Sequence, residues 1–136
     1  MTVRERKYMF NRIRDKYSKE MWIHEGDCGK YERAYSYVLS REIVMPPGSL
    51  DAPTEWNILS LLHEIGHVKT NTRNMRVYEK EYYATQWAAD EARRIGLPVK
   101  QIWKDAYRDY ILQKRQMCIN KKGRDVASVE SLMIKW

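Results

Sequence analysis

The chain has 136 residues, of which 43% are hydrophobic and 32% are charged, and its formal net charge is +7. This length predicts a single domain, residues 1–136, that can bury a core without metal or disulfide staples, and the hydrophobic content argues against a disordered chain. The positive charge would suit nucleic acid, acidic lipid or an acidic protein, but no run of Lys and Arg resembles a nucleic-acid tail, so a solvated basic surface is favoured.

The two cysteines, Cys28 and Cys118, lack C-x-x-C spacing, so we expect two free thiols in a reducing compartment, with one disulfide as the alternative. The residues after Met1 are charged rather than apolar, and no stretch approaches the roughly 18 apolar residues of a spanning helix. The sequence therefore predicts no signal peptide, no membrane contact and a cytoplasmic location.

Residues 2–20 are charged and lightly amphipathic, which predicts an N-terminal helix with a basic outer face. Its imperfect apolar stripe consists of Val3, Tyr8, Phe10, Ile13 and Tyr17. Two glycines and an aspartate then predict a turn at 26–30, and His24 lies in this turn-rich segment.

Residues 34–45 alternate in part between apolar and polar side chains, which predicts one or two strands, the second arrangement being a hairpin folded around Ser40-Arg41. Pro46-Pro47-Gly48 ends this extended segment. The expected fold class is α+β, mostly helical, with a small sheet beside the helix that follows.

That helix is predicted over 54–69. Either Asp51 or Thr54 caps it, and Pro53 is compatible with a first turn. The apolar side chains recur at helical spacing and predict a buried stripe of Ile58, Leu61, Leu62, Ile65 and Val68.

A polar loop over 70–77 precedes a predicted helix at 78–95, which ends at Gly96. A further helix is predicted over 99–118, and the residues after it give no clear pattern. The apolar positions assigned to this last helix include Val99, Ile102, Trp103, Ala106, Tyr110 and Leu112.

The helix over 54–69 ends in His63-Glu64-Ile65-Gly66-His67, an H-E-x-x-H motif. Residues four apart share a helix face, so His63 and His67 can offer two imidazoles to one zinc ion while Glu64 reaches a water bound to it. Such a site predicts a hydrolase. The alternative is that His63 and His67 are ordinary helix histidines that bind no metal.

A hydrolytic zinc site needs a third protein ligand. His24 is the remaining histidine, and a carboxylate or a thiolate is the alternative. Glu81 stands out because Ala84, Ala88 and Ala92 follow it on the same helix face, where an unpaired carboxylate would be costly to bury. The small alanines would also let this helix approach the histidine helix closely, whereas Glu79 is rotated away.

With Glu81-Tyr82-Tyr83-Ala84-Thr85-Gln86-Trp87-Ala88-Ala89, the motif resembles the ImmA/IrrE-type metallopeptidases, gluzincin-like zinc proteins often found in phages and mobile elements. The resemblance covers about 34–97, and its specific part is 63–89. It implies a zincin-like fold, Zn²⁺ as cofactor, Glu81 as third ligand and Glu64 as general base. The family usually has Asn or Asp where this chain has Thr85, a residue expected to orient a ligand.

The expected function is hydrolysis of peptide bonds in a protein or peptide, with Glu64 taking a proton from the zinc-activated water. An extended substrate could pair with an edge strand in 34–45. The stabiliser of the oxyanion is left open among five side chains, namely Tyr78, Tyr82, Tyr83, His24 and Arg73.

The alternative is a non-catalytic, metal-stabilised module that binds nucleic acid or an acidic protein through its basic helices. The helix over 99–118 carries five basic side chains for such a role, Lys100, Lys104, Arg108, Lys114 and Arg115. A solvated face is favoured over nucleic-acid contact for this stripe. The oligomeric state is not predicted.

Overall fold

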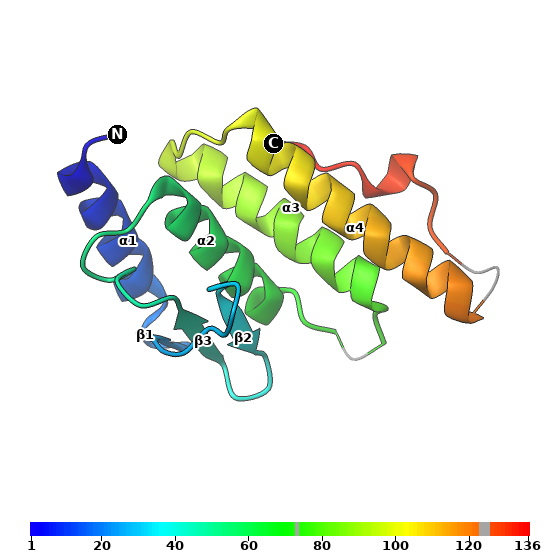
Figure 1. Ribbon diagram of the computed structural model, residues 1–136, viewed down its shortest axis with the longest axis horizontal. Helices are drawn as coiled ribbons and strands as arrows, with labels where there is room; N and C mark the ends of the chain where they lie inside the picture. Colours follow the sequence, from blue (N-terminus) through cyan, green and yellow to red (C-terminus); the bar gives the residue numbers. More distant parts are fainter. Residues whose placement is uncertain (73, 123–125) are drawn as a thin grey trace.

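The computed structural model describes residues 1–72, 74–122 and 126–136, and within them the fold is α+β, with four α-helices and a three-stranded sheet. Figure 1 shows the helices side by side with the sheet beneath the second of them. Helix α2 (Glu55–Lys69) is central, because α1 (Val3–Tyr17), the sheet and α3 (Val77–Ile95) all contact it. Helix α4 (Gln101–Lys122) packs on α3.

Helix α1 begins after Thr2, whose side chain accepts a hydrogen bond from the Glu5 amide, and it ends at Tyr17 rather than at residue 20. Three members of the predicted stripe, Phe10, Ile13 and Tyr17, are buried, whereas Val3 and Tyr8 are exposed. Tyr8 precedes Phe10 by two residues and so projects from the opposite side of the helix. Val3 lies at the first turn of the helix, away from the core.

The sheet contains β1 (Trp22–Glu25), β2 (Tyr35–Tyr37) and β3 (Glu42–Met45) in the order β1-β3-β2. Strands β2 and β3 are antiparallel and form a hairpin around Ser40-Arg41, which is the second of the two arrangements that the sequence allowed, and Arg41 adopts a φ of 54°. The sequence did not predict β1, which pairs with β3 in parallel through the register Ile23 to Ile43. His24 therefore lies on a strand and not in a turn.

Helix α2 is capped by Thr54 and not by Asp51. The Thr54 hydroxyl accepts a hydrogen bond from the Asn57 amide at 3.0 Å, and the Asn57 side chain accepts one from the Thr54 amide at 2.9 Å. Pro53 precedes the cap and therefore lies outside the first turn, although the sequence was compatible with Pro53 inside that turn. Every member of the stripe predicted for α2 is buried, and so is Leu59.

Helix α3 ends where Gly96 adopts a φ of 75°, as expected. Helix α4 extends past residue 118, and its inward face was predicted only in part, since Val99 and Trp103 pack against the core as expected. Ile102 and Ala106 are exposed, whereas Trp103, Tyr107 and Ile111 face inward. The aromatic and aliphatic side chains on both faces of α4 made the choice between neighbouring phases ambiguous.

The C-terminal segment includes a short 3-10 helix, η1 (Glu130–Leu132), and runs back along α4 (Figure 1). Leu132 is buried against Tyr78 and Ile111, and the Gln86 side chain makes two hydrogen bonds with the Lys135 backbone. Among the described residues, no helix is long and apolar enough to cross a membrane.

Candidate metal centre

Three side chains predicted as ligands converge between α2 and α3. His63 Nε2 lies 3.0 Å from Glu81 Oε2, His67 Nε2 lies 3.2 Å from the same oxygen, and the two Nε2 atoms are 3.1 Å apart. All three side chains are mostly shielded from solvent. Two imidazole nitrogens and one carboxylate oxygen thus form a nearly equilateral triangle at one point in the fold.

This triangle fits the first coordination sphere of a zinc ion. Nitrogen and oxygen ligands about 2.0–2.1 Å from a tetrahedral zinc are about 3.3 Å from one another. The observed separations of 3.0–3.2 Å need little rearrangement to reach that value. The donor set is also the one that zinc accepts in three-ligand sites.

The close approach of α2 and α3 brings Glu81 to the histidines. A Cβ atom built on Gly66, inside the H-E-x-x-H motif, would lie 2.4 Å from the Ala84 carbonyl oxygen, so only glycine fits there. On α3, the predicted small face of Ala84, Ala88 and Ala92 is buried. The missing side chain of Gly66 and the alanines together allow the helix backbones to meet.

Thr85 is buried beside His63, one helix turn beyond Glu81. Its Oγ1 lies 3.2 Å from His63 Nδ1, and only 1% of its surface is exposed. When Nδ1 carries the proton, it donates to Thr85 Oγ1 and leaves the Nε2 lone pair free for a metal. The geometry is therefore that of a side chain that orients a ligand.

Glu64 is buried at the same place and accepts a hydrogen bond from the Ser36 side chain on β2. Burial raises the pKa of the Glu64 carboxyl, and His63 and His67 oppose this rise only in part. A carboxylate with a raised pKa beside a potential metal position is suited to accept and return a proton.

The triad itself is held by strong electrostatic interactions. Burial alone would raise the pKa of Glu81, but hydrogen bonds from His63 and His67 outweigh it and lower that pKa to about 2. Burial would lower the pKa of His67, whereas the hydrogen bond and charge of Glu81 raise it. Glu81 is therefore ionised near neutral pH, as a metal ligand must be.

Two tyrosines of α4 complete the surroundings, and the sequence did not assign them to the site. The Tyr107 ring centroid lies 4.9 Å from that of His63, and its hydroxyl hydrogen-bonds Ser60. Burial and, next, the charge of Glu64 raise the Tyr107 pKa, while burial and, next, the charge of Glu81 raise the Tyr110 pKa. Tyr107 and Tyr110 are three positions apart and so share a helix face. This spacing was a weak signal, because assigning the pair to the site also required knowing which face of α4 points inward.

The other side chains considered for the oxyanion are used or placed elsewhere. Tyr78 is buried with its hydroxyl accepting the Ala127 amide, and His24 Nε2 lies 2.7 Å from Glu42 Oε1 while its ring stacks on Trp22. Tyr82 contacts Tyr83 edge-on, and Tyr83 is half exposed. Arg73 lies outside the described residues.

Cys28 and Cys118 are both free thiols, and neither belongs to the cluster of potential ligands. His24 is also absent from that cluster. Of the alternatives that the sequence left open for the third ligand, the structure thus brings only the carboxylate of Glu81 to the histidines, among the residues it describes.

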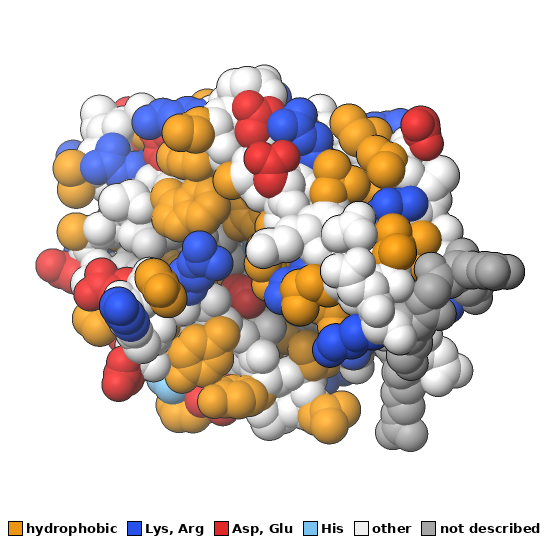
Figure 2. Space-filling view, turned by 45° about the vertical axis from the view of Figure 1, so that its right-hand side comes forward, with side chains coloured by type: hydrophobic (Ala, Val, Ile, Leu, Met, Phe, Trp, Pro, Cys, Tyr) orange, Lys and Arg blue, Asp and Glu red, His pale blue; other side chains and the backbone are white. Residues whose placement is uncertain are grey.

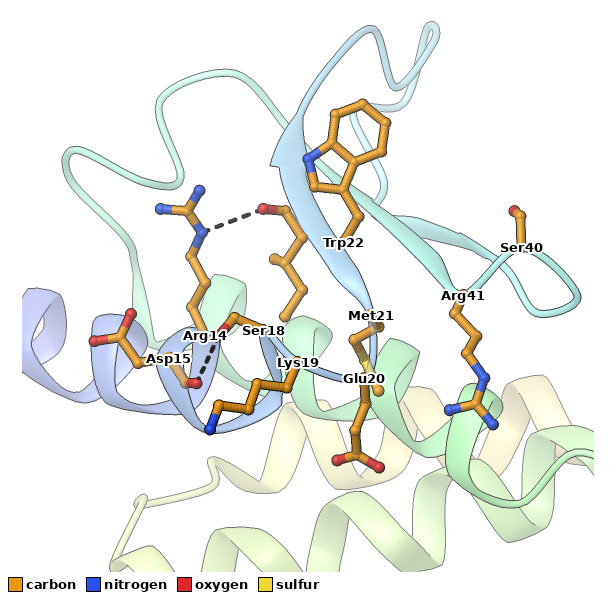
Figure 3. A pocket seen from close by; sticks show the side chains of 10 residues that line it. Arg14, Asp15, Ser18, Lys19, Glu20, Met21, Trp22, Ser40 and Arg41 are labelled. Carbon is orange, nitrogen blue, oxygen red and sulfur yellow. Dashed lines mark hydrogen bonds between the residues drawn. The ribbon is translucent and has the colours of Figure 1, made fainter.

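A cleft of about 690 Å³ adjoins the triad at His67, between the β2–β3 hairpin and the end of α2. On the face seen in Figure 2, an acidic side chain lies deep in a hollow, and hydrophobic side chains are frequent around its rim. A separate hollow of about 640 Å³ lies between α1 and the sheet, where Arg14 Nε donates to the Ile23 carbonyl (Figure 3). None of the residues lining this second hollow belongs to the triad.

Comparison of the chain with family models, with curated proteins and with solved structures finds no match.

Proposed function

We propose that this protein is a zinc-dependent metallopeptidase with a zincin-like fold, of the kind that the ImmA/IrrE resemblance implies. The observation that carries the proposal is the triangle of His63, His67 and Glu81 atoms with the buried Glu64 carboxylate beside it. Three protein ligands are typical of catalytic zinc, whereas structural zinc usually has four.

The residues divide the chemistry of peptide hydrolysis between them. When bound, zinc supplies a Lewis acid that polarises the scissile carbonyl and acidifies a coordinated water. Glu64 accepts the proton that the attacking water loses and transfers it to the amine nitrogen as the C–N bond breaks. Thr85 keeps His63 in the tautomer and orientation that binding requires.

Tyr110 is the candidate donor to the oxyanion. It is half-buried on α4, and the charges of Glu81 and Glu64 act on its hydroxyl. A protonated phenol in such a position can donate a hydrogen bond to negative charge that develops on the carbonyl oxygen. Tyr107 is less accessible because its hydroxyl already bonds to Ser60.

The proposed substrate is a protein or peptide in extended conformation. Strand β2 is an edge of the sheet and contacts α2, so a substrate strand could pair with it beside Glu64. A binding module that uses the basic side of α4 is less well supported. Arg108 forms ion pairs with Asp105 and Asp109, and the Lys100 ammonium lies 5.1 Å from the centre of the Trp103 ring.

Replacing the general base separates catalysis from metal binding. We expect Glu64→Gln to retain one zinc per chain and to lower peptide hydrolysis by about 10²–10⁴-fold. Glu79→Gln is the matched control. Glu79 lies two residues before Glu81 and accepts the Arg76 amide, which glutamine can also do. Hydrolysis of a set of fluorogenic peptides and zinc content are the measurements, and full activity of Glu64→Gln would contradict the proposal.

A further inference from the structure

The cleft beside His67 has a chemical character of its own. It is lined by the β2–β3 hairpin, by Thr70 and Asn71 after α2, and by Met75. Its volume of about 690 Å³ is within the range of roughly 300–1,000 Å³ that is usual for ligand sites. A peptide lying against β2 beside Glu64 would extend into it.

The hairpin presents apolar side chains to this cleft. Tyr37, Val38 and Leu39 line it, and Leu39 is 89% exposed although it is a large aliphatic residue. Met75, in the loop before α3, also lines the cleft. Exposed apolar side chains gathered at a concave surface are typical of a binding site, because contact with a partner removes them from water.

Lys80 is the one charged side chain, besides His67, among the described residues that line the cleft. It is half-buried and has no ion-pair or hydrogen-bond partner within the described part of the chain. By contrast, Lys7, Lys16 and Lys69 each pair with a carboxylate. An unpaired ammonium in a half-buried position favours an anionic ligand.

The net charge at the site also favours an anionic ligand. A divalent cation on the triad would be neutralised by the carboxylates of Glu81 and Glu64. Lys80, the residue before Glu81, then leaves an excess of positive charge in the adjoining cleft. A substrate carboxylate within one or two residues of the scissile bond would compensate this charge.

We propose that the cleft binds a peptide segment with a large apolar side chain and a neighbouring carboxylate, and that Lys80 holds the carboxylate. The inference rests on the proposed peptidase function and names the class of its substrate. The carboxylate is either that of an Asp or Glu side chain or that of the peptide C-terminus. Lys80 is therefore a specificity-determining residue and not a catalytic one.

The test uses zinc-loaded Glu64→Gln protein, so that binding is measured without hydrolysis. One pair of fluorescent hexapeptides carries Leu-Glu or Leu-Gln at its centre with an amidated end, and a second pair carries Leu at a free or an amidated C-terminus. We expect one carboxylate-bearing member to bind about tenfold more tightly than its neutral partner, which is the size of one charge-assisted hydrogen bond. The pair that shows the difference identifies the source of the carboxylate.

The difference should vanish in Glu64→Gln/Lys80→Met, remain in Glu64→Gln/Lys80→Arg and remain in the control Glu64→Gln/Lys104→Met, which alters a lysine of α4 outside the cleft lining. Zinc content should be equal in all four proteins. Absent binding, equal affinities within every pair, or a preference that survives Lys80→Met would overturn the inference. Lys80-dependent binding without hydrolysis by the wild-type protein would overturn the peptidase function alone.

Discussion

At the scale of single residues, His63 is the most constrained of the three potential ligands. Its Nδ1 faces Thr85, its ring packs against Tyr107, and its Nε2 faces Glu81. His67, in contrast, borders the open cleft. A ligand fixed on two sides binds a metal with less loss of conformational freedom, so the affinity should depend on the contacts of His63.

The Thr85 hydroxyl should therefore contribute to zinc affinity. We expect Thr85→Val, which keeps the shape of the side chain and removes the hydrogen bond, to weaken zinc binding by about 10–100-fold. Thr85→Ser retains a hydroxyl and should remain close to wild type. Competition with a chromophoric chelator measures both affinities, and equal values for Thr85→Val and wild type would show that the contact does not orient the ligand.

The residues that meet at the candidate site were predictable from the sequence because they follow helical periodicity. The H-E-x-x-H spacing located His63, Glu64 and His67, and the alanines three, seven and eleven positions after Glu81 on α3 singled out that glutamate. Tyr107 was not assigned because its contact with His63 depends on how α4 rotates about its axis. That rotation is fixed by packing against other elements, which no local pattern records.

At the scale of elements, the contact between α2 and α3 decides whether the site exists. The contact rests on Gly66, where a Cβ would lie 2.4 Å from the Ala84 carbonyl oxygen. In an ordinary helix interior, Gly→Ala stabilises by about 1 kcal/mol through propensity. At Gly66 the added Cβ would clash with backbone, which cannot rotate away as a side chain can. The substitution should therefore destabilise the protein.

We expect Gly66→Ala to lower the free energy of unfolding by about 1–3 kcal/mol, the usual cost of overpacking, and to weaken zinc binding because Glu81 moves away from the histidines. Ala106→Ser also adds one heavy atom to a helix, at an exposed position of α4, and should change stability by less than about 0.5 kcal/mol. Urea denaturation measures both. A Gly66→Ala protein more stable than wild type would mean that propensity outweighs the helix contact.

The sequence predicted elements well where their signals were local. The stop of α3 at Gly96 was expected from its glycine, and the hairpin at Ser40-Arg41 was one of the two arrangements that the alternation over 34–45 left open. The cap of α2 was narrowed to Asp51 or Thr54, and the reciprocal bonds between Thr54 and Asn57 decide for Thr54. Strand β1 was missed because it is four residues long, and its partner β3 lies about twenty positions further along the chain.

At the scale of the whole molecule, α2 is held by the sheet on one side and by α3 on another, so the site combines side chains from α2 and α3 with contributions from the sheet and from α4. Strand β2 supplies the Ser36 hydrogen bond to Glu64, and α4 supplies the tyrosines. The C-terminal segment adds a further contact, because the Trp136 ring lies 6.1 Å from that of Tyr107. Such long-range contacts are the part of the site that sequence patterns could not supply.

X-ray absorption spectroscopy of the zinc-loaded protein tests whether His63, His67 and Glu81 hold one catalytic zinc. We expect one zinc per chain with nitrogen and oxygen neighbours at about 2.0–2.2 Å, at least one of them exchangeable, and no sulfur. His63→Ala and Glu81→Ala should each remove protein ligands from this shell. A sulfur neighbour at about 2.3 Å, from Cys28 or Cys118, or a fourth protein ligand that closes the site, would contradict the claim.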